Sequence, residues 1–165
     1  MTILLGDGKG TFKEAKGSPF ESNKQPFGVA IGDLNGDGNP DLAVGHCSGH
    51  ITDASSDRMS ILLGAGDGTF RLAWSQLAPG KAPTRVAIGD INGDGIADAI
   101  FANYGNASVT VVLGSRREFV LAPGSPLSVG RKPSGIAVGD LNGDGKADIV
   151  TANGEDNDIS VLLTK

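Results

Sequence analysis

The sequence is poor in several residue types on which many folds and enzymes depend. Its 165 residues include a single cysteine, Cys47, which excludes an internal disulfide framework and leaves the redox compartment open. One tryptophan, one tyrosine and six phenylalanines supply few large side chains, which disfavours a helical bundle. No apolar run approaches the roughly 20 residues that a membrane-spanning helix needs, so we expect no membrane insertion.

The chain also lacks the parts of a catalytic centre. Nucleophilic catalysis needs a nucleophile, a base and an orienting group held together, but the only two histidines, His46 and His50, share one segment. No Gly-x-Ser-x-Gly elbow is present. His46, Cys47 and His50 lie within five residues, which makes a poor tetrahedral zinc cage without a second cluster. We expect neither catalysis nor zinc binding.

Acidic residues outnumber basic ones, and much of the acid is concentrated in a few segments. The formal net charge is −5, which argues against a nucleic-acid-binding surface. Glycine, at 26 residues, is about twice as frequent as in an average protein, whereas there are only 8 prolines. This combination is typical of short strands joined by tight turns and disfavours a disordered Gly/Pro-rich chain.

A nine-residue acidic loop occurs three times. The central copy, residues 90–98, reads Asp-Ile-Asn-Gly-Asp-Gly-Ile-Ala-Asp, and the others span residues 33–41 and 140–148. Loop positions 1, 3, 5 and 9 are Asp, Asn, Asp and Asp in every copy, and position 7 offers its backbone carbonyl. A glycine at position 6 permits the turn that lets a short segment surround an ion.

The loop could also be a simple turn, because Asn-Gly-Asp-Gly favours hairpins without a metal. A turn does not need Asp at positions 1, 5 and 9 in all copies, and carboxylates so close together would repel one another. We therefore predict one Ca²⁺ per loop, three per chain; Mg²⁺ is less suitable because it prefers a small rigid octahedron. Asp7 and Asp67, in separate Gly-rich turns, are interpreted as turn residues. The predicted metal ligands, with position 7 acting through its carbonyl, are Asp33, Asn35, Asp37, Asn39, Asp41, Asp90, Asn92, Asp94, Ile96, Asp98, Asp140, Asn142, Asp144, Lys146 and Asp148.

The segments around the loops repeat in step with them. The loops start 57 and 50 residues apart, and a seven-residue insertion within residues 46–58 accounts for the difference. Each unit reads as a strand of small and branched residues, the loop, a second strand, a polar connection, a third strand, a Gly-rich turn and a fourth strand. Four short antiparallel strands in about 50 residues predict a β-propeller blade. The predicted strands are 28–32, 85–89 and 135–139 (first), 42–44, 99–101 and 149–151 (second), 59–63, 109–113 and 159–163 (third), and 69–74 and 118–121 (fourth).

Both ends of the chain fall within a unit. Residues 2–12 match residues 60–70 position by position, so the chain starts in a third strand and stops in another at Leu163. We predict one all-β segment of about three blades and thirteen strands. It comprises the outer strands of a split blade (1–25), two blades (26–82 and 83–132) and the inner strands of a split blade (133–165). Closed propellers typically have four to eight blades, so we expect a homodimer to complete the ring; a fragment of a larger propeller is the alternative.

These motifs resemble the FG-GAP/VCBS repeat family of calcium-binding β-propellers. The matching pieces are the strand ending Val-Ala-Ile-Gly-Asp or Ile-Ala-Val-Gly-Asp, the Asp-x-Asn-x-Asp-Gly-x-x-Asp loop, and the turn Leu-Leu-Gly-x-Gly-Asp-Gly-Thr-Phe. The resemblance implies a first strand that lines the axis and Ca²⁺ between the first and second strands. Family members include integrin α-subunit heads, lectins and ancillary domains of secreted proteins, which implies a secreted or cell-surface location. The third turn departs from the pattern and reads Gly-Ser-Arg-Arg-Glu-Phe at residues 114–119.

A ligand surface is expected where aromatic and hydrogen-bonding side chains lie on loops, since these suit carbohydrate or peptide recognition. Trp74 has an alternative role, because it closes a fourth strand and could pack on a neighbouring blade. We expect a non-catalytic binding module for a glycan or protein ligand. The alternatives are a purely structural assembly unit and a fragment of the propeller of a larger secreted enzyme or adhesion protein. The candidate ligand residues are Trp74, Tyr104, His46, Arg85 and Arg131.

Overall fold

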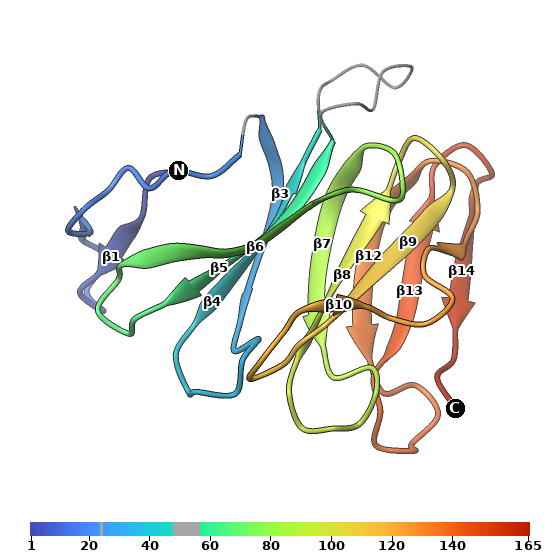
Figure 1. Ribbon diagram of the computed structural model, residues 1–165. Coiled ribbons are helices and arrows are strands. Elements are labelled where there is room, and N and C mark those ends of the chain that lie inside the picture. Colours follow the sequence, from blue (N-terminus) through green and yellow to red (C-terminus); the bar gives the residue numbers. More distant parts are fainter. Residues whose placement is uncertain (24, 48–56) are drawn as a thin grey trace.

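The computed structural model describes residues 1–23, 25–47 and 57–165, which form only strands and turns. The strands make four antiparallel groups that follow one another along the chain (Figure 1). The N-terminal hairpin pairs β1 (Leu4–Gly6) with β2 (Phe12–Glu14). The first full sheet has the order β3 (Pro26–Gly32), β4 (Asp41–His46), β5 (Arg58–Gly64) and β6 (Phe70–Leu77).

The other two groups repeat this arrangement. The second full sheet contains β7 (Pro83–Gly89), β8 (Asp98–Asn103), β9 (Ser108–Leu113), β10 (Val120–Leu121) and β11 (Leu127–Ser128). The C-terminal sheet contains β12 (Pro133–Gly139), β13 (Asp148–Asn153) and β14 (Asp158–Leu162). The first strand of each of these three sheets begins at a proline: Pro26, Pro83 or Pro133. These are the positions where the sequence repeat places its unit boundaries. In these described segments no helix is long and apolar enough to cross a membrane.

The part of the chain that the structure describes has fourteen strands, one more than the predicted thirteen. The fourth strand of the second full sheet is divided into β10 and β11, which both pair with β9. Between them the chain leaves the sheet at Ala-Pro-Gly-Ser-Pro, where the Ser125 hydroxyl accepts the N–H of Val111 at 2.9 Å in place of a strand partner. The N-terminal unit repeats this detail, since Ser18 accepts the N–H of Ile3 at 3.1 Å.

The first strands of the three sheets lie side by side, with β7 between β3 and β12. Small residues allow this approach. A Cβ added to Gly28 of β3 would lie 2.7 Å from the carbonyl oxygen of Thr84 in β7. The sequence of small residues in each first strand therefore has a direct packing role, as a propeller axis requires.

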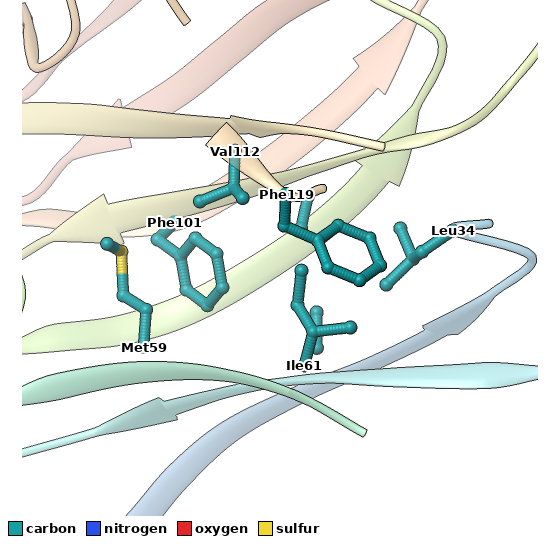
Figure 2. Close-up of a cluster of buried hydrophobic side chains, with 8 residues drawn as sticks. Leu34, Met59, Ile61, Phe101, Val112 and Phe119 are labelled. Carbon is teal, nitrogen blue, oxygen red and sulfur yellow. The ribbon is translucent and has the colours of Figure 1, made fainter. Parts of the chain in front are cut away.

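Successive sheets pack face to face. Alternate residues of a strand point to opposite faces, so each sheet has a forward face, toward the next sheet in the chain, and a backward face, toward the preceding one. The forward face of the first full sheet meets the backward face of the second in a buried apolar cluster (Figure 2). Its labelled members are Leu34, Met59, Ile61, Phe101, Val112 and Phe119.

The same forward-to-backward contact recurs on both sides of this cluster. Ile100, Val109 and Val111 of the second full sheet pack against the C-terminal sheet. Leu42 and Val44 on the backward face of the first full sheet pack against residues of the N-terminal unit, including Ile3. The molecule is therefore a row of sheets that share one kind of interface.

Candidate functional site

The three acidic loops occupy equivalent places in the fold. Each joins the first strand of a sheet to the second, between β3 and β4, β7 and β8, and β12 and β13. All three lie at the same end of the strands, at the bottom of the view in Figure 1. Glycines at loop positions 4 and 6 have positive φ in every copy, which an L-residue with a side chain rarely adopts: Gly36, Gly38, Gly93, Gly95, Gly143 and Gly145.

The polar side chains at positions 1, 3 and 5 organise the loop backbone in the same way each time. The position 1 carboxylate accepts the N–H of position 4 at 2.6–2.7 Å and that of position 6 at 2.8–2.9 Å. The position 3 amide oxygen accepts the N–H of position 5 at 2.9 Å. The position 5 carboxylate accepts the N–H of position 7 at 2.8–2.9 Å.

The position 9 carboxylate connects each loop to the third strand of its sheet. One oxygen accepts the N–H of loop position 2, and the other accepts an N–H at or just after the end of the third strand, all at 2.8–2.9 Å. The third-strand donors are Gly64, Gly114 and Thr164. Asp41, Asp98 and Asp148 have no exposed surface, so these are buried charge-assisted hydrogen bonds.

Burial raises the pKa of Asp41 and of Asp98 above the ordinary value for aspartate, and repulsion from the position 1 and position 5 carboxylates adds a smaller effect. The pKa of Asp148 is lowered instead, because the N–H groups of Leu141 and Thr164 stabilise its charged form. Asp148 is equally inaccessible, but its sheet has a neighbour on one side only, so desolvation is the smaller influence there.

These donors match the chemistry of calcium, which takes carboxylate, amide and carbonyl oxygens. Within the described ranges, however, no group of three or more His, Cys, Asp or Glu side chains comes together as a metal site. The loop carboxylates are directed toward backbone N–H groups, and binding an ion would require positions 1, 5 and 9 to converge further. The calcium sites stay predictions. Asp7 and Asp67 accept hydrogen bonds from Thr11 and Thr69 within their own turns, as turn residues do.

Trp74, one of the predicted ligand residues, lines a cavity of about 760 Å³ between the first and second full sheets. Its indole is half-buried and also packs against the apolar cluster of Figure 2, as the alternative packing role predicted, while its ligand role stays a prediction. Arg71, Arg116 and Arg117 line the same cavity. The sequence prediction did not include these arginines, although the departure of the third turn from its repeat pattern was a signal for two of them.

Arg85 and Tyr104 lie together at the opposite end of the sheets from the acidic loops. They line a cavity of about 230 Å³ with Phe27, and the Arg85 guanidinium lies 5.9 Å from the centre of the Phe27 ring. Arg85 also donates to the carbonyl oxygen of Ser134 at 3.1 Å. Arg131 lines an adjoining cavity that also includes Tyr104, and it forms ion pairs with Glu155 and Asp156, whereas Trp74 lies in the separate cavity described above. The five predicted ligand residues therefore do not form one site.

The assignment of His46 to a ligand surface is wrong. Its side chain has no exposed surface at the end of β4, where it takes the place that buried Asn103 and Asn153 hold in the next two sheets. The Asn103 amide donates to the hydroxyls of Ser108 and Thr110, and the Asn153 amide donates to Asp158 and Ser160, so this position joins the second strand to the third in the second full sheet and the C-terminal sheet. Cys47 is also buried. His50, the third residue considered for zinc, lies outside the described residues.

A row of antiparallel sheets that each carry the same acidic loop defines a β-propeller-like repeat module. The chain belongs to the FG-GAP-like repeat family, whose sequence model matches residues 1–44, 51–101 and 97–151. Comparison with curated protein sequences gave no match. All three matched segments end in the second strand of a sheet, at β4, β8 and β13, so the sequence repeat is out of phase with the sheets.

Proposed function

We propose that this protein is a calcium-stabilised β-propeller module that acts outside the cell or at its surface as a non-catalytic binding unit. One observation carries the calcium part. The same acidic loop stands at the same register in three sheets, and its position 9 carboxylate ties it to the third strand. A divalent cation would offset the carboxylate charges and fix the connection between the first and second strands of each sheet.

The side chains at positions 1, 3, 5 and 9 and the carbonyl at position 7 would hold each ion. Without a bidentate Glu at position 12, the affinity should be modest, near the roughly 10⁻⁴–10⁻³ M of extracellular modules. The ions are structural in this proposal, because the surrounding groups brace the turn between the first and second strands.

Metal content and thermal unfolding test the calcium proposal. Equilibrium dialysis should give three Ca²⁺ per chain, and EDTA should lower the unfolding midpoint because an ion that binds only the folded state stabilises it. Asp94→Asn should reduce the stoichiometry to two, since the position 5 ligand of one loop is lost. Asp67→Asn, in a turn outside the loops, is the control and should retain three. An unfolding midpoint that EDTA leaves unchanged would contradict the proposal.

The binding role is supported by the cavity beside Trp74, which combines an aromatic side chain with several hydrogen-bond donors. Glycans and proteins are the two ligand classes proposed. A glycan array shows whether the ligand is a glycan. Probing the array with and without EDTA shows whether ligand binding depends on calcium. Glycan binding that disappears with calcium supports a calcium-organised glycan-binding module. Absence of any glycan binding removes that class.

A second candidate role, assembly of a ring from two chains, is supported by the exposed forward face of the C-terminal sheet. Ile159 and Val161 are 65% and 48% exposed, whereas Met59 and Ile61 at the same register of the first full sheet are 0% exposed. The exposure of these residues supports a further inter-sheet contact, which a second chain would supply.

A matching backward face is exposed at the other end of the row. Leu4 and Phe12 of the N-terminal hairpin are 58% and 67% exposed, and Val29 and Ile31 of β3 are 56% and 69% exposed. Val29 and Ile31 pair with Val44 and Leu42, so they lie on the backward face of their sheet. The forward face of one chain can thus receive the backward face of another, and two such contacts close a symmetric ring.

The native mass tests this assembly. We expect a dimer, twice the 16.7 kDa of one chain. Val161→Glu should convert it to a monomer, because a charge is placed in an apolar contact. Lys81→Glu, at an exposed turn, is the control and should remain dimeric. A wild-type protein that is monomeric at tens of micromolar would remove the ring.

A further inference from the structure

The cavity between the first and second full sheets is built from three segments that are distant in sequence. Strand β6 contributes Arg71 and Trp74, the β9–β10 turn contributes Arg116 and Arg117, and the acidic loop at residues 33–41 contributes Asp37. Its volume of about 760 Å³ falls in the range of small-ligand sites, roughly 300–1,000 Å³.

A β-bulge in β6 brings Trp74 to this cavity. Ile61 pairs with Trp74, but the next residue, Leu62, pairs with Leu72, so Ala73 is the extra residue. Directly paired residues share a face, and Ile61 is on the forward face, which assigns Trp74 to that face as well. Arg71 pairs with Leu63, two residues after Ile61, and is therefore on the same face. Without the bulge, Arg71 and Trp74 would lie on opposite faces.

The β9–β10 turn is held against the first full sheet at several points. The N–H of Ser115 donates to the carbonyl oxygen of Leu34 at 3.0 Å, and Phe119 is buried in the cluster of Figure 2. A Cβ added to Gly36 would lie 3.2 Å from Nε of Arg116, so this guanidinium lies against the acidic loop. The two arginines are thus carried by a short turn that is anchored at both ends.

The equivalent turns of the other units have different chemistry. They carry Asp7 and Asp67, which accept hydrogen bonds from threonines of their own turns. In the third turn these acids are absent, and the Ser115 hydroxyl accepts the N–H groups of Arg117 and Glu118 instead. The third turn thus has Arg116 and Arg117 where the other two have Gly-rich sequence, and it lines the same cavity as Trp74.

Asp37 and Glu118 line the cavity together with the three arginines, so basic side chains outnumber acidic ones by one. Among the residues that the structure describes, every ion pair lies in the contact between residues 131–132 and 155–156. Within those residues, Arg71, Arg116 and Arg117 therefore have no carboxylate within ion-pair distance. Three guanidinium groups gathered around one cavity favour an anion, which they can bind through paired N–H donors.

We propose that this cavity binds an acidic saccharide, with the carboxylate or sulfate group on the arginines and a sugar ring against the Trp74 indole. Arginine matches planar oxyanions, and the indole offers an apolar face with one polar edge, which suits a sugar ring that is apolar on one side. The proposal rests on the binding role given above and specifies its ligand class and residues.

Isothermal titration with three tetrasaccharides of similar size tests it. Hyaluronan supplies carboxylates, chondroitin sulfate supplies carboxylate and sulfate, and the chitin tetrasaccharide is neutral. We expect saturable binding of at least one acidic tetrasaccharide and none of the neutral one. The double variant Arg116→Ala/Arg117→Ala should weaken binding at least tenfold, and Arg71→Ala should weaken it measurably. Lys13→Ala is the matched control, because Lys13 pairs with Leu5 as Arg71 pairs with Leu63 but lies outside this cavity.

Equal binding of the neutral and acidic tetrasaccharides, or equal affinity in wild type and the double arginine variant, would overturn the proposal. So would a preference for an acidic peptide over both acidic saccharides. The calcium stoichiometry of the double variant shows which proposal has failed, the acidic-saccharide site or the calcium-stabilised binding module. If three ions still bind and another glycan binds independently of the arginines, the module keeps its role and only this site is wrong.

Discussion

At the scale of single residues, the aspartate at loop position 9 has more than one role. The sequence pattern predicts it as a calcium ligand. The structure shows that its two oxygens also satisfy backbone N–H groups from the loop and from the third strand, in a fully buried position. The position 9 carboxylate therefore has a structural role that needs no metal. Without it, the two backbone N–H groups would be buried without a hydrogen-bond acceptor, which costs free energy of folding. Positions 1 and 5, which are more exposed, are the better test of calcium.

Arg131 provides a prediction about pH. Its backbone N–H and guanidinium donate to the Asp156 carboxylate and hold the pKa of Asp156 below the ordinary value. A lowered folded-state pKa stabilises the protein above the unfolded pKa of about 3.9, and that contribution is lost as the pH falls through the folded-state value.

Arg131→Ala should therefore raise the pKa of Asp156 part of the way, since the backbone donor remains. Carboxyl NMR titration at low salt measures this shift. Lys132→Ala is the control, because Lys132 pairs with Glu155 at 3.3 Å and not with Asp156. If both variants shift the pKa of Asp156 equally, that pKa is lowered by the general positive charge nearby and not by the ion pair with Arg131.

At the scale of elements, the fourth strands are where the structure departs from the repeat pattern. Positions of the three first, second and third strands follow from the repeat, because each copy has the same alternation and the same loop. The fourth strands do not. One contains a bulge at Ala73 and another is divided around Ser125. Outer strands have fewer neighbours, so packing constrains their sequence less and local turn chemistry decides their path.

Gly114, at the junction of β9 and its turn, gives an element-scale prediction. A Cβ there would overlap the carbonyl oxygen of Ala97, while the residue's N–H must reach Asp98 at 2.8 Å. Gly114→Ala should lower the free energy of unfolding by about 2–3 kcal/mol, since both contacts are with backbone or buried groups. Gly139→Ala is the control, because an added Cβ there meets nothing within 4 Å. Urea denaturation in the presence of calcium measures the free energy of unfolding of both variants. Equal losses of stability would contradict the close packing described at Gly114.

At the scale of the whole molecule, the sheets differ mainly in how many neighbours they have. The second full sheet is packed on both faces, whereas the C-terminal sheet is packed on its backward face only. Strands β8 and β13 each have a hydrogen-bonded strand on both sides within their own sheet. They therefore differ in side-chain packing and not in backbone pairing. In a row of repeats, the stability of each unit depends on its own contacts and on those of its neighbours.

Amide hydrogen exchange should detect this difference. In dilute protein, β13 should exchange at least tenfold faster than β8, because burial of even one or two large apolar side chains is worth about 1.5–3 kcal/mol each. If two chains close a ring, protection of β13 should rise with protein concentration while that of β8 stays constant. Equal protection of both strands in the dilute monomer would contradict this account.

The sequence by itself determined the all-β class, the sheet boundaries at Pro26, Pro83 and Pro133, and the place of each acidic loop between first and second strands. These follow from local patterns repeated in register, where side-chain alternation and turn chemistry act over a few residues. The tertiary structure decided what no local pattern contains. It showed that His46 is buried, that Arg131 pairs with acidic side chains, and that Trp74 meets Arg71, Arg116 and Arg117. The approach of Trp74 to Arg116 and Arg117 depends on how two sheets pack, because these residues lie more than 40 positions apart in the chain.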